Sequence, residues 1–400
     1  MATHHRAGFM TGLALLFPIT LSTMAIVLLA PVLPDLLREF AGVPNHEYWV
    51  PMVLTVPALC VALFSPLAGI LGDWFGRRRL LLGAFLAYAV VGIAPMFLSS
   101  LETILVSRVA VGITEAMIMV LSTTMIGDYF EGAARDRWLA GQTAMASLSA
   151  MLFLNIGGFL GRFGWRETFW VYLSALLMFA LVLAFTWDPS AKDGEEEVTA
   201  APHAANWADF PWLHMGGIVL VTLFGSILFY TVQIQSPIGL HQLGITDPAH
   251  IGFLTSLASI GVPVGTAIYS RLGSRLTVTT LLLVEFALLA TGFLLMSRSG
   301  APAGFLAGCF VNQLGAGMLL PTLLVWAISG LAFDMRSRGA GIWTGAFSVG
   351  QFLSPLVVTA AASLAGGLMG AFGVLAGAAA LGTVAALVAR TRATPAVAPA

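Results

Sequence analysis

The stretch Gly69-Ile-Leu-Gly-Asp73-Trp-Phe-Gly76-Arg77-Arg78-Arg79 holds the densest cluster of charge in the sequence. It lies between two apolar runs, 48–71 and 80–98, and each run approaches or exceeds the roughly 20 residues that a membrane helix needs. Gly76 tolerates a sharp turn that would hinder most other residues. The stretch therefore predicts a tight basic hairpin that joins two membrane helices on one side of a bilayer.

The composition points to a lipid environment. The chain has 400 residues, of which 58% are hydrophobic and 9% charged, whereas a soluble domain is about 25% charged. A net charge of −1 gives no electrostatic reason to bind nucleic acid. The histidines lack metal-ligand spacing and no phosphate-binding Gly-x-x-x-x-Gly-Lys-Ser/Thr loop occurs, so we expect no metal, no cofactor and no enzymatic activity.

Twelve apolar segments satisfy the length criterion for membrane helices. The first, which follows Arg6, is too long for the core of a signal peptide, about 7–15 residues, and is expected to be retained. The predicted fold is an all-α integral membrane protein. Its spans are expected at about 8–33, 48–71, 80–99, 103–126, 138–161, 168–187, 211–236, 251–270, 276–297, 303–328, 339–364 and 366–389.

One polar segment, 188–210, separates the sixth span from the seventh. Its charged, apolar-poor composition is typical of a flexible tether. The sequence thus predicts an N-terminal six-helix bundle at 1–187 and a C-terminal six-helix bundle at 211–400.

The basic residues indicate the orientation. If spans alternate, thirteen fall on the side of both termini and four on the opposite side, with Arg108 left inside a span. The positive-inside rule then makes the first side cytoplasmic, and we expect a multi-pass protein of the cell membrane, as in a bacterial inner membrane. The thirteen are Arg6, Arg77, Arg78, Arg79, Arg135, Arg137, Lys192, Arg271, Arg275, Arg336, Arg338, Arg390 and Arg392.

The two halves resemble each other. Arg271-Leu-Gly273-Ser-Arg275 follows the eighth span as Trp74-Phe-Gly76-Arg77-Arg78 follows the second. Halves of equal orientation, related by an axis along the membrane normal, describe one class of transporters, with the substrate bound between them near the middle of the membrane.

Three motifs resemble the major facilitator superfamily, and within it the twelve-helix branch of drug/proton antiporters. The hairpin matches the loop signature of that family at Gly69, Asp73, Gly76, Arg77 and Arg78. Arg108 and Gly112 match an Arg-x-x-x-Gly signature of the fourth span, and the segment 157–169 is similar to the usual passage from the fifth span to the sixth. The resemblance implies two bundles of six helices each.

Arg108 and Glu115 are the leading candidates for proton coupling. They lie seven residues apart on the fourth span, which places them on one helix face about 10 Å apart, and Gly112 is expected to leave room around the arginine. Ionisable residues inside a membrane are costly and face a cavity or a partner. Glu115 is expected to bind a proton, and Arg108 either tunes its proton affinity or binds a neighbouring carboxylate. The alternatives are direct contact of Glu115 with substrate, and a structural ion pair or polar packing. Asp35 is expected either to approach Arg108 or to pair with Arg38.

Polar and aromatic residues of the seventh, tenth and eleventh spans are candidates for substrate contact, although buried amides often only join helices. Glu285 of the ninth span is expected either to be neutral or to pack inward, because a charged glutamate facing lipid would be costly. The candidates for substrate contact are Tyr230, Gln233, Asn312, Trp326 and Trp343.

The family resemblance also implies a conformational latch on the cytoplasmic side. In this interpretation the charges of Asp73, Arg77, Asp128 and Arg135 link the two halves when that side is closed, and Gly69, Gly76 and Arg78 complete the motif. The alternative is that the arginines only fix the topology.

The sequence thus predicts a secondary transporter that works by alternating access as a functional monomer. Its partners are expected to be a small-molecule substrate, protons and the lipid bilayer. Proton-coupled export of a small organic compound is the leading hypothesis. The alternatives are a symporter or facilitator that imports a metabolite such as an organic acid, with Arg108 binding its carboxylate, and a membrane receptor or membrane enzyme that transports nothing.

Overall fold

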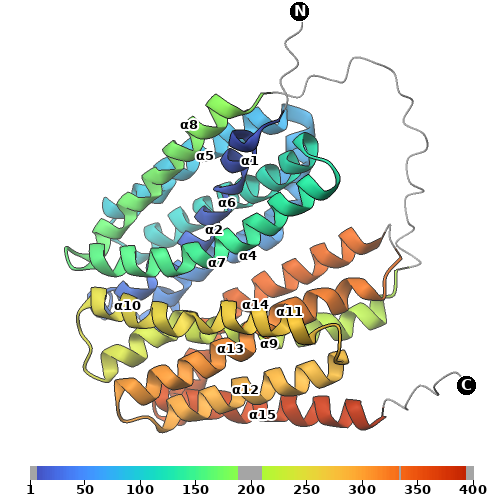
Figure 1. Ribbon diagram of the computed structural model, residues 1–400. Helices are drawn as coiled ribbons and strands as arrows, with labels where there is room; N and C mark the ends of the chain where they lie inside the picture. Colours follow the sequence, from blue (N-terminus) through green and yellow to red (C-terminus); the bar gives the residue numbers. More distant parts are fainter. Residues whose placement is uncertain (1–6, 188–209, 333–334, 393–400) are drawn as a thin grey trace, which may run out of the picture. The chain divides into compact units, whose positions relative to one another are not determined.

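In the part of the chain that the structure describes, the protein consists of long helices joined by short turns (Figure 1). The computed structural model describes residues 7–187, 210–332 and 335–392, and within them twelve helical segments are long and apolar enough to span a membrane. The predicted all-α fold with twelve spans is confirmed. In chain order the elements are α1 (Phe9–Leu16), α2 (Ile19–Val27), η1 (Ala30–Val32), α3 (Leu33–Glu39), α4 (His46–Phe75), α5 (Arg77–Ile93), η2 (Ala94–Met96), α6 (Leu101–Tyr129), α7 (Gly132–Gly161), η3 (Trp165–Leu173), α8 (Ser174–Phe185), α9 (Trp212–Gln242), α10 (Pro248–Ser259), α11 (Gly261–Leu272), α12 (Val278–Arg298), α13 (Pro302–Ser329), α14 (Arg336–Ala365) and α15 (Leu368–Arg392).

The first span is longer and less regular than predicted. It runs from Phe9 to Glu39 rather than from 8 to 33, and it is divided into α1, α2, η1 and α3. Pro18, Pro31 and Pro34 lie at these divisions, and a proline interrupts a helix because it has no N–H to donate. The breaks leave backbone carbonyls without helical partners, and the candidate site uses one of them.

The basic hairpin turns on a single residue, as predicted. Gly76 separates α4 from α5 with a φ of 86°, a region that side-chain-bearing residues rarely adopt. Gly273, the counterpart of Gly76 in the second half, has a φ of −59°. The two basic turns therefore correspond in position along the chain but not in backbone conformation.

The chain packs as two units. The first unit contains the first six spans together with Asp247–Phe253. The second unit contains the seventh span, the eighth span from Leu254 onward and the last four spans. The sequence predicts that the segment Asp247–Phe253 belongs to the C-terminal bundle, whereas its packing groups it with the first unit. The polar linker predicted at 188–210 lies outside the described residues except for Phe210, and so do Arg6 and Lys192.

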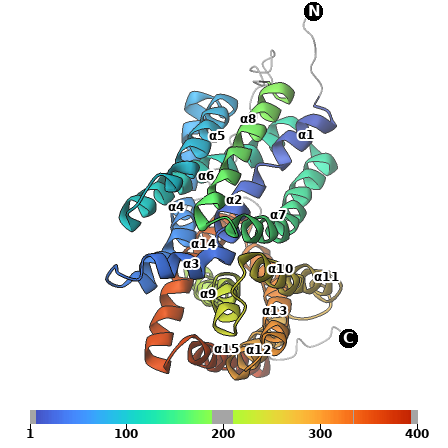
Figure 2. The same cartoon turned by 90° about the vertical axis from the view of Figure 1, so that its left-hand side faces the viewer.

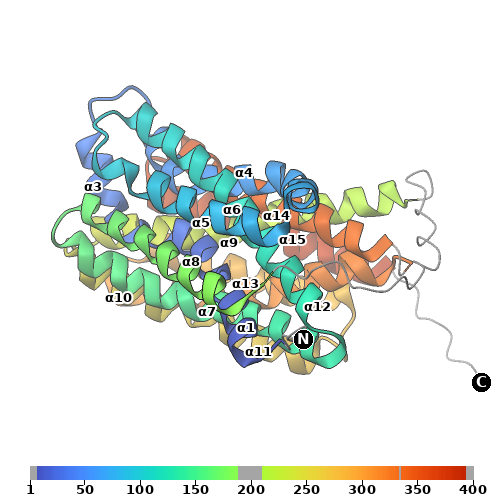
Figure 3. The same ribbon diagram turned by 90° about the horizontal axis from the view of Figure 1, so that it is seen from above.

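The same pairs of spans pack together inside each unit. In the first unit α4 and α5 both pack on α6 (Figure 3), α5 also contacts α8, and α2 contacts α7 (Figure 1). In the second unit α11 and α12 both pack on α13, α12 also contacts α15, and α9 contacts α14 (Figure 2). The internal repeat predicted from the basic turns therefore extends to helix packing.

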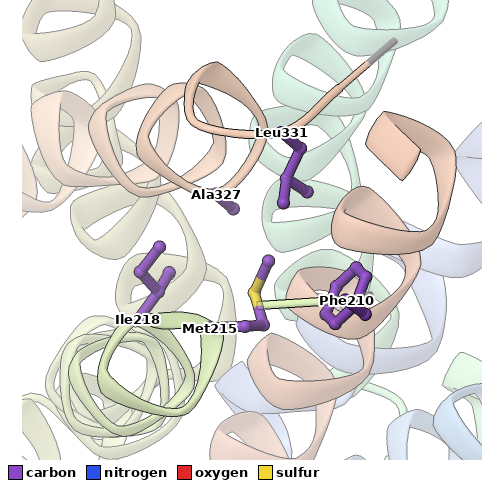
Figure 4. Packing of buried hydrophobic residues seen from close by; sticks show 5 residues of the cluster. All are labelled: Phe210, Met215, Ile218, Ala327 and Leu331. Atoms are coloured by element: carbon purple, nitrogen blue, oxygen red, sulfur yellow. The ribbon is translucent and has the colours of Figure 1, made fainter. Parts of the chain in front are cut away.

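A cluster of apolar side chains joins the start of α9 to the end of α13 in the second unit (Figure 4). Met215 and Ile218 of α9 lie with Ala327 of α13, and Phe210 and Leu331 flank the two helices. Within lipid such contacts stabilise through close packing rather than through exclusion of water. The cluster holds together two helices that carry candidate substrate residues.

Candidate functional site

Arg108 lies in the middle of the first unit with no exposed surface. It is carried by α6, whose first turn is capped by the Ser100 side chain, which accepts a hydrogen bond from the backbone N–H of Thr103 at 3.3 Å. An arginine charge at the centre of a bilayer costs at least about 2.5–3.5 kcal/mol. Its N–H groups therefore need acceptors within the protein.

Three neutral acceptors from three other spans surround the guanidinium. Its Nε donates to the Val53 carbonyl at 2.8 Å, its Nη2 to the Ala25 carbonyl at 3.0 Å and its Nη1 to the Tyr172 hydroxyl at 2.6 Å. The Val53 carbonyl is free because the residue four positions later, Pro57, has no N–H. Arg108 thus connects the first, second, fourth and sixth spans without a carboxylate.

Gly112 brings α4 close enough for this arrangement. A Cβ atom at position 112 would lie 2.6 Å from the Cα of Pro57 and from the Cβ of Cys60. The expectation that this glycine leaves room around Arg108 is wrong, because the space that it leaves is filled by the backbone of α4. Its role is to allow the proline kink of one helix to contact the next.

Tyr172, the hydroxyl partner of Arg108, is held by its aromatic neighbours. It is fully buried, stacks on Phe169 with ring centroids 5.9 Å apart and lies 5.3 Å from the ring of Tyr88. Gly92 of α5 makes room for it, since a Cβ atom there would approach the tyrosine ring to 2.2 Å. The hydroxyl therefore has a fixed position next to the arginine.

Glu115 lies further along α6, with only 3% of its surface exposed. Its carboxyl group is hydrogen bonded to the side chain of Ser22 in α2 and lies within electrostatic range of Arg108. Its Oε2 atom has no hydrogen-bond partner. Within the described residues Arg108 and Glu115 form no direct ion pair; the guanidinium donates instead to two backbone carbonyls and a tyrosine hydroxyl.

Asp35 does not approach Arg108. It lies in α3, partly exposed, and pairs with Arg38 at 3.3 Å. The alternative that the sequence left open for this residue, a local pair one turn away, is the one that the structure contains. Extension of the first span to Glu39 explains this placement, because it carries Asp35 onto a separate short helix.

The basic hairpin forms a charge cluster within the first unit. Arg77 donates to Asp128 at 2.6 Å through Nη1 and to Asp73 at 2.8 Å through Nη2, so that it joins α4, α5 and α6. Arg78 donates to the Leu183 carbonyl and to the Thr186 hydroxyl. These bonds connect four spans of one unit.

Two other members of the predicted latch form no part of these hydrogen bonds. Arg135 contacts its neighbour Asp136 at 3.7 Å rather than Asp128. A Cβ atom at Gly69 would have one neighbour, Val120, at 4.0 Å, so this glycine is not required for close packing.

The predicted substrate contacts of the seventh and tenth spans include a chain of buried amides. Gln233 of α9 donates to the Gln313 side chain of α13 at 2.6 Å, and Gln313 donates to its neighbour Asn312 at 3.4 Å. Asn312 in turn donates to the Leu289 carbonyl of α12 at 3.4 Å. The amides join three helices, and the Oε1 atom of Gln233 has no hydrogen-bond partner.

The predicted aromatic contacts divide between two places in the second unit. Tyr230 of α9 and Trp343 of α14 both pack against Phe347, with ring centroids 5.4 and 5.5 Å from it. Trp326 lies next to the ring of His214 and against the apolar cluster of Figure 4, which Trp343 also contacts. The buried indole N–H of Trp343 has no hydrogen-bond partner.

The loop before α10 carries an ion pair that the sequence did not suggest. Arg162 binds both carboxylate oxygens of Asp247, at 2.9 Å and 2.6 Å. The Arg162 guanidinium lowers the pKa of Asp247 from 3.8 to about 2. A Cβ atom at Gly158 would lie 2.5 Å from the Pro248 carbonyl oxygen, so glycine also allows α7 and the start of α10 to touch.

The partners of Arg108 and of Glu115 are the part of the site that sequence reasoning missed. The signal for one of them was present, because a proline inside an apolar run marks a free carbonyl four residues earlier, and for Pro57 that residue is Val53. Ser22 and Tyr172 carried no such signal. Their positions depend on which helices pack side by side.

Twelve membrane spans, arranged as two units with the same internal packing, define a membrane transporter built from a repeated half. The sequence model of the Major Facilitator Superfamily matches residues 15–246, which is more than half of the chain. The protein belongs to this superfamily and is a multi-pass membrane transporter rather than an enzyme.

Several transporters are similar over most of the chain. The tetracycline resistance protein, class G, of Vibrio anguillarum is 27% identical over 87% of this chain and 89% of its own. The multidrug efflux pump LfrA of Mycolicibacterium smegmatis is 25% identical over 76% of this chain and 71% of its own. The inward-facing, unoccupied crystal structure of a bacterial homolog to the human lysosomal transporter Spinster superposes with a TM-score of 0.78 at 16% identity, covering 97% of this chain and 98% of its own. That structure supports the fold alone.

Proposed function

We propose that the protein is a secondary active transporter that works by alternating access and exports a small organic compound in exchange for protons. The observation that carries the proposal is the state of Glu115. This carboxyl group is almost completely enclosed in the first unit, has a hydroxyl partner in Ser22 and retains one oxygen atom without a partner.

Such a carboxyl group is suited to bind and release a proton. Its charged form is poorly solvated in lipid, whereas the positive charge of Arg108 on the same helix face favours that form. Neutral groups satisfy three of the arginine's N–H groups, so its charge is not cancelled by a neighbouring carboxylate. A movement that changed the access of water to Glu115 would then change its proton occupancy. Exchange of substrate for protons requires this coupling between conformation and proton binding.

Export is the direction that the relatives support. One is named for resistance to tetracycline and the other for multidrug efflux, and we propose a substrate of comparable size with some apolar character. The amides and aromatics of the second unit, including Gln233, Asn312, Trp326, Trp343 and Tyr230, are proposed to line its path.

We also propose how the protein is oriented in the membrane and how its two bundles move. The excess of basic residues on the side of both termini supports a cytoplasmic location for those termini in a bacterial inner membrane. We propose that two bundles within one monomer rock about the substrate. The bundles are residues 1–187 and 211–400, and the linker 188–210 joins them. We propose that the charge cluster of Asp73, Arg77 and Asp128 serves as the cytoplasmic latch, with Arg135 recruited in another conformation.

Reconstitution into liposomes with an imposed pH gradient tests the proposal. The wild-type protein should move a substrate from a panel that includes tetracycline against its gradient while protons flow the other way. Glu115→Gln should abolish proton movement linked to substrate, whereas Glu102→Gln, in the exposed first turn of the same helix, should leave it intact.

Two outcomes would overturn the proposal. Normal proton-linked transport by Glu115→Gln would remove the proton site. Accumulation of an organic acid in the direction of the proton gradient would establish import by symport instead.

A further inference from the structure

A second buried glutamate lies in the other unit. Glu285 of α12 has no exposed surface. Thr322 of α13 donates a hydrogen bond to its Oε1 atom at 2.6 Å, while its Oε2 atom has no hydrogen-bond partner. Glu115 in the first unit has the same kind of surroundings. Its carboxyl group is also hydrogen bonded to a hydroxyl from another span, and one of its oxygen atoms also has no hydrogen-bond partner.

The Thr322 hydroxyl has two acceptors for one hydrogen. Its Oγ1 atom lies 2.6 Å from Glu285 Oε1 and 3.1 Å from the Met318 carbonyl of its own helix. If the glutamate is ionised, the hydroxyl donates to the carboxylate. If the glutamate is protonated, its O–H donates to Oγ1 and the threonine hydrogen turns to Met318. Rotation of one hydroxyl therefore satisfies both protonation states.

The surroundings place little other charge near Glu285. Among the groups of the neighbouring elements, Tyr269 of α11 lies within electrostatic range of it. Helix α13 carries no acidic, basic, histidine or tyrosine residue, and the ionisable residues of α15 are Arg390 and Arg392 at its end. Within the part of the chain that the structure describes, no cation forms an ion pair with Glu285.

The atoms available also suit a proton better than a metal ion. Hard metal cations take about six or more oxygen ligands, whereas Glu285, Thr322 and the Met318 carbonyl offer only a carboxylate, one hydroxyl and one carbonyl. A proton needs only a donor atom and an acceptor atom, which the carboxyl and hydroxyl groups supply.

We infer that Glu285 and Thr322 form a second proton-binding site, carried by the second unit and separate from Glu115. The inference rests on the proposed function, in which protons drive transport. It assigns one titrating glutamate to each unit, so that more than one proton is bound in a transport cycle.

The test uses dicyclohexylcarbodiimide, which modifies protonated carboxyl groups in apolar surroundings. The full-length protein in liposomes is treated over a pH series, and the label on each glutamate is measured by peptide mass spectrometry. Labelling of Glu285 should fall about tenfold for each pH unit above a midpoint, as for one titrating group. Thr322→Ser should keep that midpoint and Thr322→Val should shift it.

The matched control is Thr291→Val. Thr291 also lies on α12 but bonds only the Ala287 carbonyl of its own helix, so its loss should leave the midpoint of Glu285 in place. Labelling of Glu285 that does not change with pH would overturn the inference, because the residue would then be a permanently neutral packing group. A midpoint that Thr322→Val fails to move would also overturn it.

The same measurement separates this inference from the proposed function. In Glu115→Gln the label on Glu285 should still titrate, whether or not that variant transports. If Glu115→Gln transports normally, the proposed function fails while the site in the second unit is still decided by its own titration. In a functional transporter, Glu285→Gln should reduce the number of protons moved per substrate; an unchanged ratio would contradict the second site.

Discussion

Replacement of Gly112 by alanine should separate α4 from α6 and release Arg108 from its acceptor. The new methyl carbon would lie 2.6 Å from the Pro57 Cα and from the Cys60 Cβ, whereas carbon atoms in contact settle at about 3.5–4.0 Å. The helices would therefore have to move apart by about 1 Å. Because Pro57 lies one turn from Val53 on α4, that movement acts directly on the hydrogen bond between Val53 and Arg108.

The structure sets the size of the effect. The bond from Arg108 Nε to the Val53 carbonyl is 2.8 Å long, and an extension of about 1 Å takes it beyond the usual range of about 2.7–3.2 Å. Loss of a hydrogen bond to a charged group costs about 1.5–3 kcal/mol, and overpacking costs about 1–3 kcal/mol. The free energy of unfolding should fall by about 2.5–6 kcal/mol.

Unfolding in mixed micelles and proton-linked transport in liposomes together measure the effect. The control is Gly127→Ala on the same helix, where a Cβ atom would have nothing within 4 Å; that change should be neutral or stabilise by about 0.5–1 kcal/mol. If Gly112→Ala unfolds and transports like Gly127→Ala, the reasoning that this glycine sets the position of Arg108 is wrong.

Three further changes test other contacts. Asp247→Asn should lower the melting temperature above pH 4 only, since Arg162 depresses the pKa of Asp247 to about 2 and the stabilisation is lost as the pH falls from 4 to 2; a difference from wild type that is constant with pH would contradict the ion pair. Thr266→Val should cost about 1–3 kcal/mol in unfolding experiments, because it leaves the Gly317 carbonyl, freed by the proline four residues later, without its partner at 2.9 Å. Asp73→Asn should slow transport in liposomes while membrane insertion and expression stay normal; turnover at the wild-type rate would refute the latch.

Matched variants separate these effects from general damage. Thr344→Val removes a hydroxyl that bonds only the Ala340 carbonyl of its own exposed turn and should change unfolding far less than Thr266→Val. Asp136→Asn removes a surface carboxylate, 71% exposed and 3.7 Å from Arg135, and should leave transport unchanged. Equal effects of the test and control variants would show that the contacts themselves contribute nothing.

Much of the fold could be predicted from the sequence because the bilayer imposes strict requirements. A span needs a long apolar run, and twelve such runs are present where predicted. The turn at Gly76 could be predicted because glycine tolerates backbone conformations that few other residues adopt, and its φ is indeed 86°. The division of the first span into short helices was not predicted, although the three prolines at the divisions are present in the sequence.

The candidate site could be predicted only as a set of unusual residues. Arg108 and Glu115 stand out because charge is scarce in an apolar span, and they do lie buried on one helix. The hydrogen-bond partners of these two side chains could not be predicted from the sequence. Of the two arrangements that the sequence leaves open for Asp35, the structure contains the local pair with Arg38, because the first span continues into a separate short helix.

The sequence by itself determined the spans, the basic hairpin and the presence of ionisable residues such as Arg108 and Glu115 inside a span, since each follows from local composition and backbone preference. Only the tertiary structure decided what those charges contact. The carbonyls of Ala25 and Val53 and the hydroxyl of Tyr172 reach Arg108 from three other helices. Their approach depends on proline breaks and on glycines that let backbones touch, and those contacts exist only after residues far apart in the chain have packed together.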